Sequence, residues 1–217
     1  METLIKEERF DFVSAENKRF IIDFTKQMNL VGYDFGGEIG SGYCWGKYMV
    51  IYSQTGVKSK KVIARVFIRN NDVIIFGGRE IRYNNSIVLR LFFSNIDKHE
   101  SYIENTPPHI KTPFIDGHGM CRHCKENCSR YRKAYTIDGK QIEKCAGVVF
   151  EFHDPKAEYI KDYMDILGEF YGKKYPKNKL MFFSECKKQN IKTDTENDLL
   201  KYFWKHNIFY RSDDLST

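Results

Sequence analysis

Four cysteines within one short, polar stretch of the chain could bind a metal ion together. They follow the pattern C-x2-C-x3-C-x16-C and are Cys121, Cys124, Cys128 and Cys145. Thiolates separated by two residues can form a knuckle whose backbone amides face the sulfur atoms, and tetrahedral zinc sites commonly use this spacing. The four cysteines therefore predict a structural zinc site.

A β-hairpin would bring Cys145 back to the other three cysteines. Asp138-Gly139 stands between two short strand-like runs, and both residues favour the positive φ angles of a two-residue turn. With these turn residues, the register of the hairpin places Arg132 opposite Cys145. Cys128 then lies just beyond the open end of the hairpin, so a four-thiolate site closes without a long ordered loop.

Other thiol chemistry competes with this interpretation. His118 and His123 lie close enough in sequence to replace one cysteine ligand. An iron–sulfur cluster, thiol-based redox sensing, or reduced cysteines buried as small apolar side chains would use the same residues. Zinc is favoured because the thiol count and the knuckle suit a closed site, and because a polar, loop-like segment is a poor place to bury four thiols.

Cys44 is a candidate nucleophile. Its surroundings, Gly42-Tyr43-Cys44-Trp45-Gly46, match a nucleophile elbow with cysteine in place of serine and resemble the G-x-C-x-G turn of dienelactone-hydrolase-type enzymes. An elbow needs a strand before the nucleophile and a helix after it, whereas here glycine-rich sequence precedes Cys44 and a strand-like run follows. A thiol at the start of a strand is therefore the favoured interpretation.

The chain of 217 residues is basic, with a net charge of +6 and a pI near 8.9, so its surface attracts phosphates or acidic partners. A nucleic-acid-binding protein with a basic track is consistent with this charge, although scattered charges can serve solubility alone. The residues of the basic track are Lys58, Lys60, Lys61, Arg65, Arg122, Arg130, Arg132 and Lys133. A pocket lined by Tyr43, Trp45 and Tyr48 would instead favour a small ligand.

The hydrophobic pattern predicts an α+β fold. Ser14 can cap a helix over residues 15–28, where apolar residues recur at helical spacing. Runs rich in valine, isoleucine and aromatic residues then alternate with turn residues, which is typical of an antiparallel meander. The runs are KYMVIY, VIARVFI, DVIIF and SIVLRLFF, with GVVFEF as a later strand. We expect an antiparallel sheet of four to five strands, helices on one face, and the cysteine-bound hairpin.

Further helices are predicted after the meander. One begins at Ser94, and Pro107-Pro108 ends it and allows a second short helix. Asp154-Pro155 supplies an N-cap and a first-turn proline for a later amphipathic helix.

Two parts of the chain are expected. Residues 1–172 form the main domain, which includes the cysteine segment 118–145, and residues 173–217 form a helical extension docked on it. No run of about 18 apolar residues occurs, and the N-terminus lacks the basic-then-apolar order of a signal peptide. We therefore expect a cytoplasmic protein without a membrane partner.

Several short motifs lie between about Gly42 and Leu167. They are Ile96-Asp97-Lys98, Tyr102-Ile103-Glu104, Pro108-His109-Ile110, and Tyr135-x-Ile137-Asp138-Gly139-Lys140 leading to Lys144-Cys145. With these motifs the chain resembles uncharacterised bacterial proteins that combine a small antiparallel α+β domain with a C-x2-C-x3-C cluster. The resemblance implies that the cysteines and the hairpin form one unit, and it implies no activity.

These observations favour a non-enzymatic binding protein in which a structural zinc ion clamps residues 118–145 onto the sheet and shapes a binding surface. Nucleic-acid binding by the basic track is the second hypothesis. A cysteine-dependent enzyme centred on Cys44 is the third.

Overall fold

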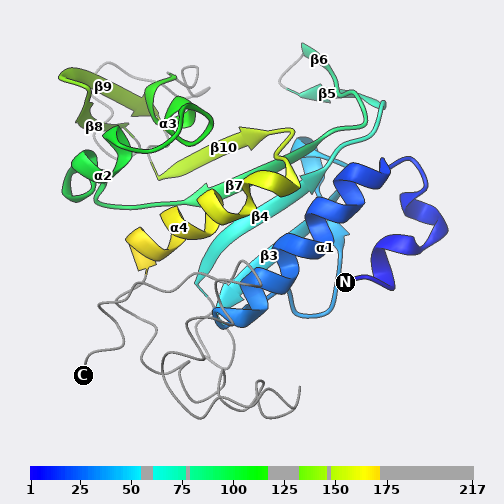
Figure 1. Ribbon diagram of the computed structural model, residues 1–217. Helices are drawn as coiled ribbons and strands as arrows, with labels where there is room; N and C mark the ends of the chain where they lie inside the picture. The colour runs from blue at the N-terminus through cyan, green and yellow to red at the C-terminus, as the bar shows by residue number, and fades with distance from the viewer. Residues whose placement is uncertain (55–60, 77–78, 117–131, 146–147, 172–217) are drawn as a thin grey trace, which may run out of the picture.

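An antiparallel sheet forms the centre of the protein (Figure 1), and the computed structural model describes residues 1–54, 61–76, 79–116, 132–145 and 148–171. The strand order is β1-β3-β4-β7-β10, and β2 pairs with β3 beside this path. The strands are β1 (Tyr33–Asp34), β2 (Gly40–Ser41), β3 (Tyr48–Gln54), β4 (Val62–Ile68), β7 (Ile87–Phe92) and β10 (Val149–His153). The predicted α+β class is confirmed.

The predicted meander is wrong at one strand. The run DVIIF forms β5 (Val73–Phe76), but β5 pairs only with β6 (Arg79–Arg82) in a separate two-stranded sheet, while β4 pairs directly with β7. Gly77-Gly78 separates the two strands in sequence, so β5 pairs with the strand that follows it directly. Val73 and Ile75 are 42% and 77% exposed, so this hairpin has little apolar cover.

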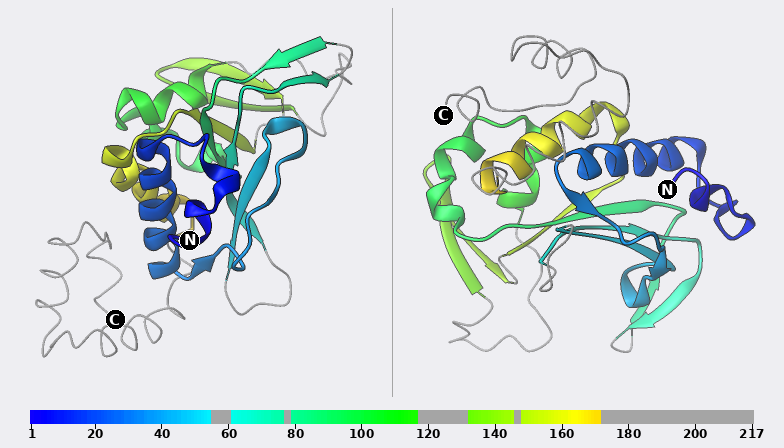
Figure 2. Two further views of the ribbon diagram at one scale, coloured as in Figure 1. Left: turned by 90° about the vertical axis from the view of Figure 1, so that its right-hand side faces the viewer. Right: turned by 90° about the horizontal axis from the view of Figure 1, so that it is seen from below.

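Two helices, α1 (Ala15–Leu30) and α4 (Ile160–Tyr171), pack against each other on one face of the central sheet (Figure 2). The predicted start of α1 is confirmed: the Ser14 hydroxyl accepts a hydrogen bond from the Asn17 amide at 3.2 Å. Apolar residues on the buried stripe of α1 recur three or four positions apart and meet the sheet. They are Phe20, Ile21, Phe24 and Met28.

Two predicted helix starts are wrong for the same physical reason. Asn95, which follows the expected cap Ser94, and Asp154, the other expected cap, both have left-handed backbone, with φ of 58° and 46°, and neither angle lets a helix start there. In place of one helix from Ser94, the chain forms η4 (Ile96–Lys98) and then α2 (Glu100–Glu104). After Asp154, η5 (Ala157–Tyr159) precedes α4, and Lys156 occupies the N-cap position of η5 without a side-chain hydrogen bond to that helix.

Helix α3 (Pro108–Ile115) begins at Pro108, at the site where the proline pair was expected to start a short helix. Its Phe114 stacks on Phe150 of β10, with ring centroids 4.2 Å apart. One hydrophobic cluster joins residues of α1, α2, α3 and α4 with the sheet, so the described α-helices cover the same face. Short 3-10 turns also occur at η1 (Leu4–Lys6), η2 (Glu8–Phe10) and η3 (Tyr43–Trp45).

The hairpin of β8 (Arg132–Ile137) and β9 (Lys140–Cys145) has the predicted register, with Arg132 opposite Cys145. The φ angles of Asp138 and Gly139 are 50° and 72°, as a type I′ turn requires. Residues 173–217, the expected helical extension, lie outside the described residues. Among the described helices, none combines the length and apolar character needed to cross a bilayer.

Candidate functional site

Cys145 lies at the junction of two structural units. It is the last residue of β9, and β10 begins at Val149, which pairs with Phe92 of the central sheet. Cys121, Cys124 and Cys128, together with His118 and His123, lie outside the described residues. The four-thiolate zinc site therefore stays a prediction.

The described residues on both sides of the cysteine segment lie near Cys145. Arg132, which follows the segment, is the strand partner of Cys145. Asp116, which precedes it, is close enough to Lys144 to affect the pKa of that lysine. Asp116 and Arg132, which flank the segment that carries the three other cysteines, thus both lie near the end of β9.

Helix α3 anchors the hairpin through backbone carbonyls of its last turn. The last four carbonyls of a helix have no partner within the helix. The Tyr135 hydroxyl donates to the Phe114 carbonyl at 2.5 Å, and the Lys144 ammonium donates to the Pro113 carbonyl at 2.8 Å. Both strands of the hairpin therefore cap α3.

Lys144 is a buried lysine, 0% exposed, with its ammonium 4.0 Å from the centre of the Phe150 ring. Burial lowers its pKa to about 7, although the negative charges of Glu151 and Asp116 act in the opposite direction. A lysine directly before Cys145 in sequence is thus held by α3 and β10 together.

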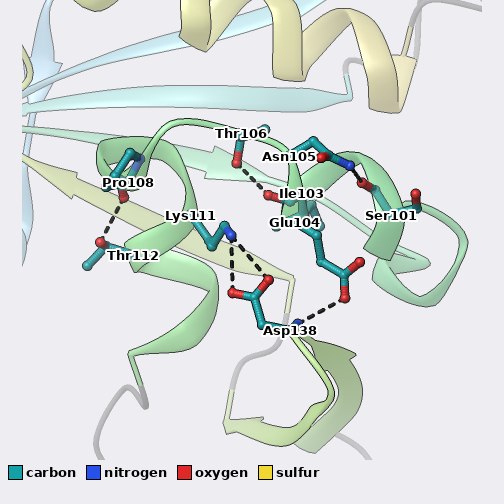
Figure 3. A network of polar contacts seen from close by, with 9 residues as sticks. All are labelled: Ser101, Ile103, Glu104, Asn105, Thr106, Pro108, Lys111, Thr112 and Asp138. Atoms are coloured by element: carbon teal, nitrogen blue, oxygen red, sulfur yellow. Dashed lines mark hydrogen bonds and ion pairs between the residues drawn. The ribbon is translucent and has the colours of Figure 1, made fainter.

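Helix α2 supports the other edge of the hairpin (Figure 3). The Glu104 carboxylate accepts the Asp138 amide at 2.9 Å, and the Asp138 carboxylate accepts from the Lys111 ammonium at 3.1 and 3.2 Å. The Glu100 carboxylate accepts the Thr136 amide at 2.6 Å. These amides point away from β9, so the glutamates satisfy an edge strand that would otherwise be open to pairing.

Two histidine–carboxylate pairs join α4 to the α2–α3 region. His99 lies 2.8 Å from Glu169 and its ring packs on Phe170, whereas His109 lies 2.8 Å from Asp162. The partners are 70 and 53 residues apart in sequence, so no local pattern could have revealed them. The two pairs are separate and do not form one site, and each stabilises the packing of α4 against the α2–α3 region.

The face of the central sheet opposite α1 and α4 carries arginines in consecutive strands. Arg65 of β4 is in register with Arg90 of β7, which is in register with Glu151 of β10. Alternation along the strands puts all three side chains on the face where Phe67 and Val88 form a small separate cluster. We call Arg65, Arg69, Arg90, Glu151 and Trp45 the arginine face.

Arg90 is the central residue of the arginine face. Its guanidinium donates to Glu151 from two nitrogens and lies 4.9 Å from the Trp45 ring centre and 4.6 Å from that of Phe67. Burial alone would raise the pKa of Glu151, but the charge and hydrogen bonds of Arg90, with His153 and Arg69, lower it. Glu151 is therefore a carboxylate committed to neutralising Arg90.

The predicted basic track divides between different parts of the molecule. Lys58, Lys60, Arg122 and Arg130 lie outside the described residues. The Lys61 ammonium lies over the Tyr171 ring of α4, on the helix side, whereas Arg65 is on the opposite face. Lys133 and Arg132 are on the hairpin strand β8.

The sequence contained a signal for the arginine face that was not considered when the basic track was predicted. Arg65 and Arg90 each stand in the middle of an otherwise apolar strand, VIARVFI and SIVLRLFF. A charged residue at such a position marks the face of the strand away from the apolar core. Only the strand order could show that the two positions are neighbours.

The segment around Cys44 does not have the architecture of a nucleophile elbow. Cys44 lies in η3, between β2 and β3, so a strand follows it where an elbow needs a helix. Tyr43, Trp45 and Tyr48 do not share one pocket either, since Tyr48 packs on Phe10 in the main core. Trp45 packs on Phe67 at the other face of the sheet.

Comparison of the chain with protein-family models, with curated proteins and with solved structures found no match. What can be inferred about function therefore depends on the chain's own residues.

Proposed function

We propose that this is a non-enzymatic binding protein in which Cys121, Cys124, Cys128 and Cys145 hold a structural zinc ion. The observation that carries the proposal is the register of the β8–β9 hairpin, in which Arg132 lies opposite Cys145. Cys128 is four residues before Arg132 in the sequence, so a metal ion shared with Cys145 would need only a short connection. Four thiolates on a tetrahedral ion would then tie residues 117–131 to the junction between the hairpin and the central sheet.

The surroundings of Cys145 suit a structural ligand better than a reactive thiol. Its hairpin is held by α3 through Tyr135 of β8 and Lys144 of β9, and β10 begins a few residues later. A ligand on such a fixed backbone needs little reordering when the metal binds. Metal binding and folding of the cysteine segment are expected to be coupled, because an unfolded chain holds no preformed site.

Metal content tests this proposal directly. The protein purified without chelator should contain one zinc ion per chain by native mass spectrometry and elemental analysis. Cys145→Ser should lose the ion, because it removes the only ligand supplied by β9. Cys44→Ser is the matched control: it removes a cysteine outside the cluster and should keep zinc at the wild-type level.

Three results would contradict the proposal. They are wild-type protein without metal, a visible iron–sulfur chromophore, and Cys145→Ser protein that retains zinc like the wild type. The same variants test the third hypothesis, because ester or thioester hydrolysis that disappears in Cys44→Ser would identify an enzyme.

A further inference from the structure

Among the described residues, the three arginines of the arginine face outnumber the carboxylates near them, Glu151 and Asp154. Arg65 and Arg90 are cross-strand partners, and like charges directly opposite each other destabilise a sheet. In the described part of the chain, the Glu151 carboxylate accepts hydrogen bonds from Arg90 and lies 3.8 Å from the His153 ring, whereas the buried Nε atom of Arg65 has no hydrogen-bond partner. Within the described residues, the Arg65 guanidinium therefore has no carboxylate partner.

The surroundings of Arg65 increase its need for an anion. Burial and the nearby charge of Arg90 lower its pKa, which shows that both disfavour the charged form. Its guanidinium carbon lies 5.3 Å from the Phe92 ring centre. A ring face stabilises the cation only weakly. A phosphate would supply the missing charge and two acceptors for the guanidinium fork.

A tight turn displays aromatic rings beside these arginines. Tyr43 has a left-handed backbone with φ of 52°, and a Cβ atom on Gly42 or Gly46 would lie 2.4 or 2.9 Å from backbone oxygens. The Arg69 guanidinium also donates to the Trp45 carbonyl at 2.9 Å. We call residues 42–46 the aromatic turn. Backbone held in this strained form often serves a site.

The rings of the aromatic turn are exposed. Tyr43 is 75% exposed and Trp45 is 41% exposed, although Trp45 packs on Phe67 and lies over Arg90. Large aromatic side chains left open beside cations are typical of surfaces on which bases stack. An acidic peptide would match the charge but offers no flat ring for these side chains.

We propose that the arginine face and the aromatic turn bind single-stranded nucleic acid, with Arg65 contacting a phosphate and Trp45 stacking on a base. Arg65 is the cross-strand partner of Arg90, and Arg90 lies 4.9 Å from the Trp45 ring centre, so one extended strand could reach both groups. Base–aromatic stacking tolerates any base, so binding should depend little on sequence. This inference rests on the proposal that the protein is a binder and is independent of the zinc ion.

Fluorescence anisotropy on the full-length, metal-bearing protein tests the phosphate contact. The probe is a fluorescein-labelled oligothymidine of about 12 nucleotides, titrated between about 50 and 200 mM salt. Arg65→Gln should weaken binding about tenfold and reduce the salt slope by about 0.7, the loss of one phosphate contact. Arg19→Gln is the matched control, because it removes an arginine from the solvent side of α1, where its side chain is 76% exposed.

Intrinsic fluorescence tests the stacking contact separately. The chain has two tryptophans, so Trp204→Phe leaves Trp45 as the only one. Oligothymidine should quench the fluorescence of this variant, and Arg65→Gln in the same background should shift the quenching curve to higher concentration. Tyr43→Gly removes the neighbouring ring and accepts the positive φ, so it should stay folded and weaken binding.

Each remaining outcome would overturn the inference. These are absence of binding at low salt, equal loss in Arg19→Gln and Arg65→Gln, or binding without quenching of Trp45. Competition by polyglutamate as strong as competition by unlabelled oligonucleotide would identify an acidic protein as the partner instead. Loss of zinc in Cys145→Ser is read by elemental analysis, so failure of the metal proposal and failure of this inference are distinguishable.

Discussion

The central sheet and the β8–β9 hairpin are stabilised by different means. In the central sheet, aromatic and aliphatic side chains from α1, α4 and five strands are buried in one cluster. Of the hairpin side chains that the structure describes, Tyr135 and Ile137 belong to the buried part of that cluster. The hairpin is held mainly by polar contacts to α2 and α3, in which side chains satisfy backbone groups at strand edges and helix ends.

This difference shows where a metal ion would matter. A two-stranded hairpin is marginally stable alone and needs packing or another constraint. Apolar burial in the central sheet scales with area and makes its unfolding cooperative, whereas the hairpin depends on a few separate contacts. A zinc ion at Cys145 would add a constraint at the open end of the hairpin, where the anchors of α2 do not reach.

The largest expected effect is a loss of stability in the central sheet. Phe24 is fully buried between α1 and β3, with its ring centre 5.4 Å from that of Tyr52. Phe24→Ala leaves a cavity there and should lower the free energy of unfolding by about 3–5 kcal/mol. Urea denaturation checks this, and Phe24→Leu, which keeps most of the volume, should cost less than about 1.5 kcal/mol.

Hydrogen exchange on the same variant sharpens the comparison. Because the hairpin depends on α3, and α3 packs on β10, Phe24→Ala should reduce amide protection in both regions. Protection that falls in the central sheet but not in the hairpin would show that the hairpin is an independent folding unit.

Acid should destabilise the central sheet through Glu151. Its pKa is lowered in the folded protein, mainly by Arg90, so its stabilising contribution is present above its ordinary value of 4.5 and is lost as the pH falls through the folded value. Glu151→Gln should cost roughly 2 kcal/mol at pH 7, because a charge-assisted hydrogen bond is lost. The difference from wild type should shrink toward pH 3, and Glu158→Gln, an exposed control on η5, should change little at either pH. If Glu151→Gln and the wild type differed in unfolding free energy by the same amount at pH 7 and pH 3, the contribution of Glu151 would not depend on its charge, and the prediction would be wrong.

A smaller effect should be confined to the hairpin. Tyr135→Phe removes the hydroxyl that donates to the Phe114 carbonyl and leaves that carbonyl unpaired in the interior. We expect a loss of about 1–2 kcal/mol in the local opening free energy of β8 and β9. Hydrogen exchange should speed up at hairpin amides and stay unchanged in β3 and β4. Equal acceleration in all strands would contradict the division into two regions.

Metal removal should act in the same direction as Tyr135→Phe. Chelation should lower amide protection in the hairpin before the central sheet melts, since the proposed ligand Cys145 belongs to β9. A chelator that lowers the unfolding midpoint of the whole protein with no earlier change in the hairpin would mean that the two regions are one cooperative unit.

Local signals in the sequence predicted the elements that are fixed by nearby residues. Ser14 caps α1 as expected, and Asp138-Gly139 sets the hairpin register because its φ angles suit only one kind of turn. The pairing of β4 with β7 could not be predicted in this way. In the structure β5 pairs with β6 instead of with β4, and which strands pair is not a property of any one run.

The same distinction between local and long-range signals applies to the candidate sites. The arrangement of Cys145 opposite Arg132 follows from turn geometry and was predictable. The arginine face requires three strand pairings at once, so Arg90 and Glu151 could not be joined to Arg65 from sequence patterns. Long-range pairs such as His99 with Glu169 are invisible for the same reason.

The smallest expected effect concerns the turn of the hairpin. Glu104 accepts the Asp138 amide, and Asp138 in turn accepts from Lys111. The Asp138 side chain is 48% exposed, so solvent can replace part of what is lost. Glu104→Ala should therefore lower the local opening free energy by only about 0.5 kcal/mol, near the low end for a hydrogen bond. Exchange of the Asp138 and Gly139 amides should accelerate, and Glu158→Ala should leave both unchanged. If Glu104→Ala opened the hairpin as strongly as Tyr135→Phe, the edge contacts of α2 would matter as much as the capping of α3, and the hairpin would be held evenly along its length.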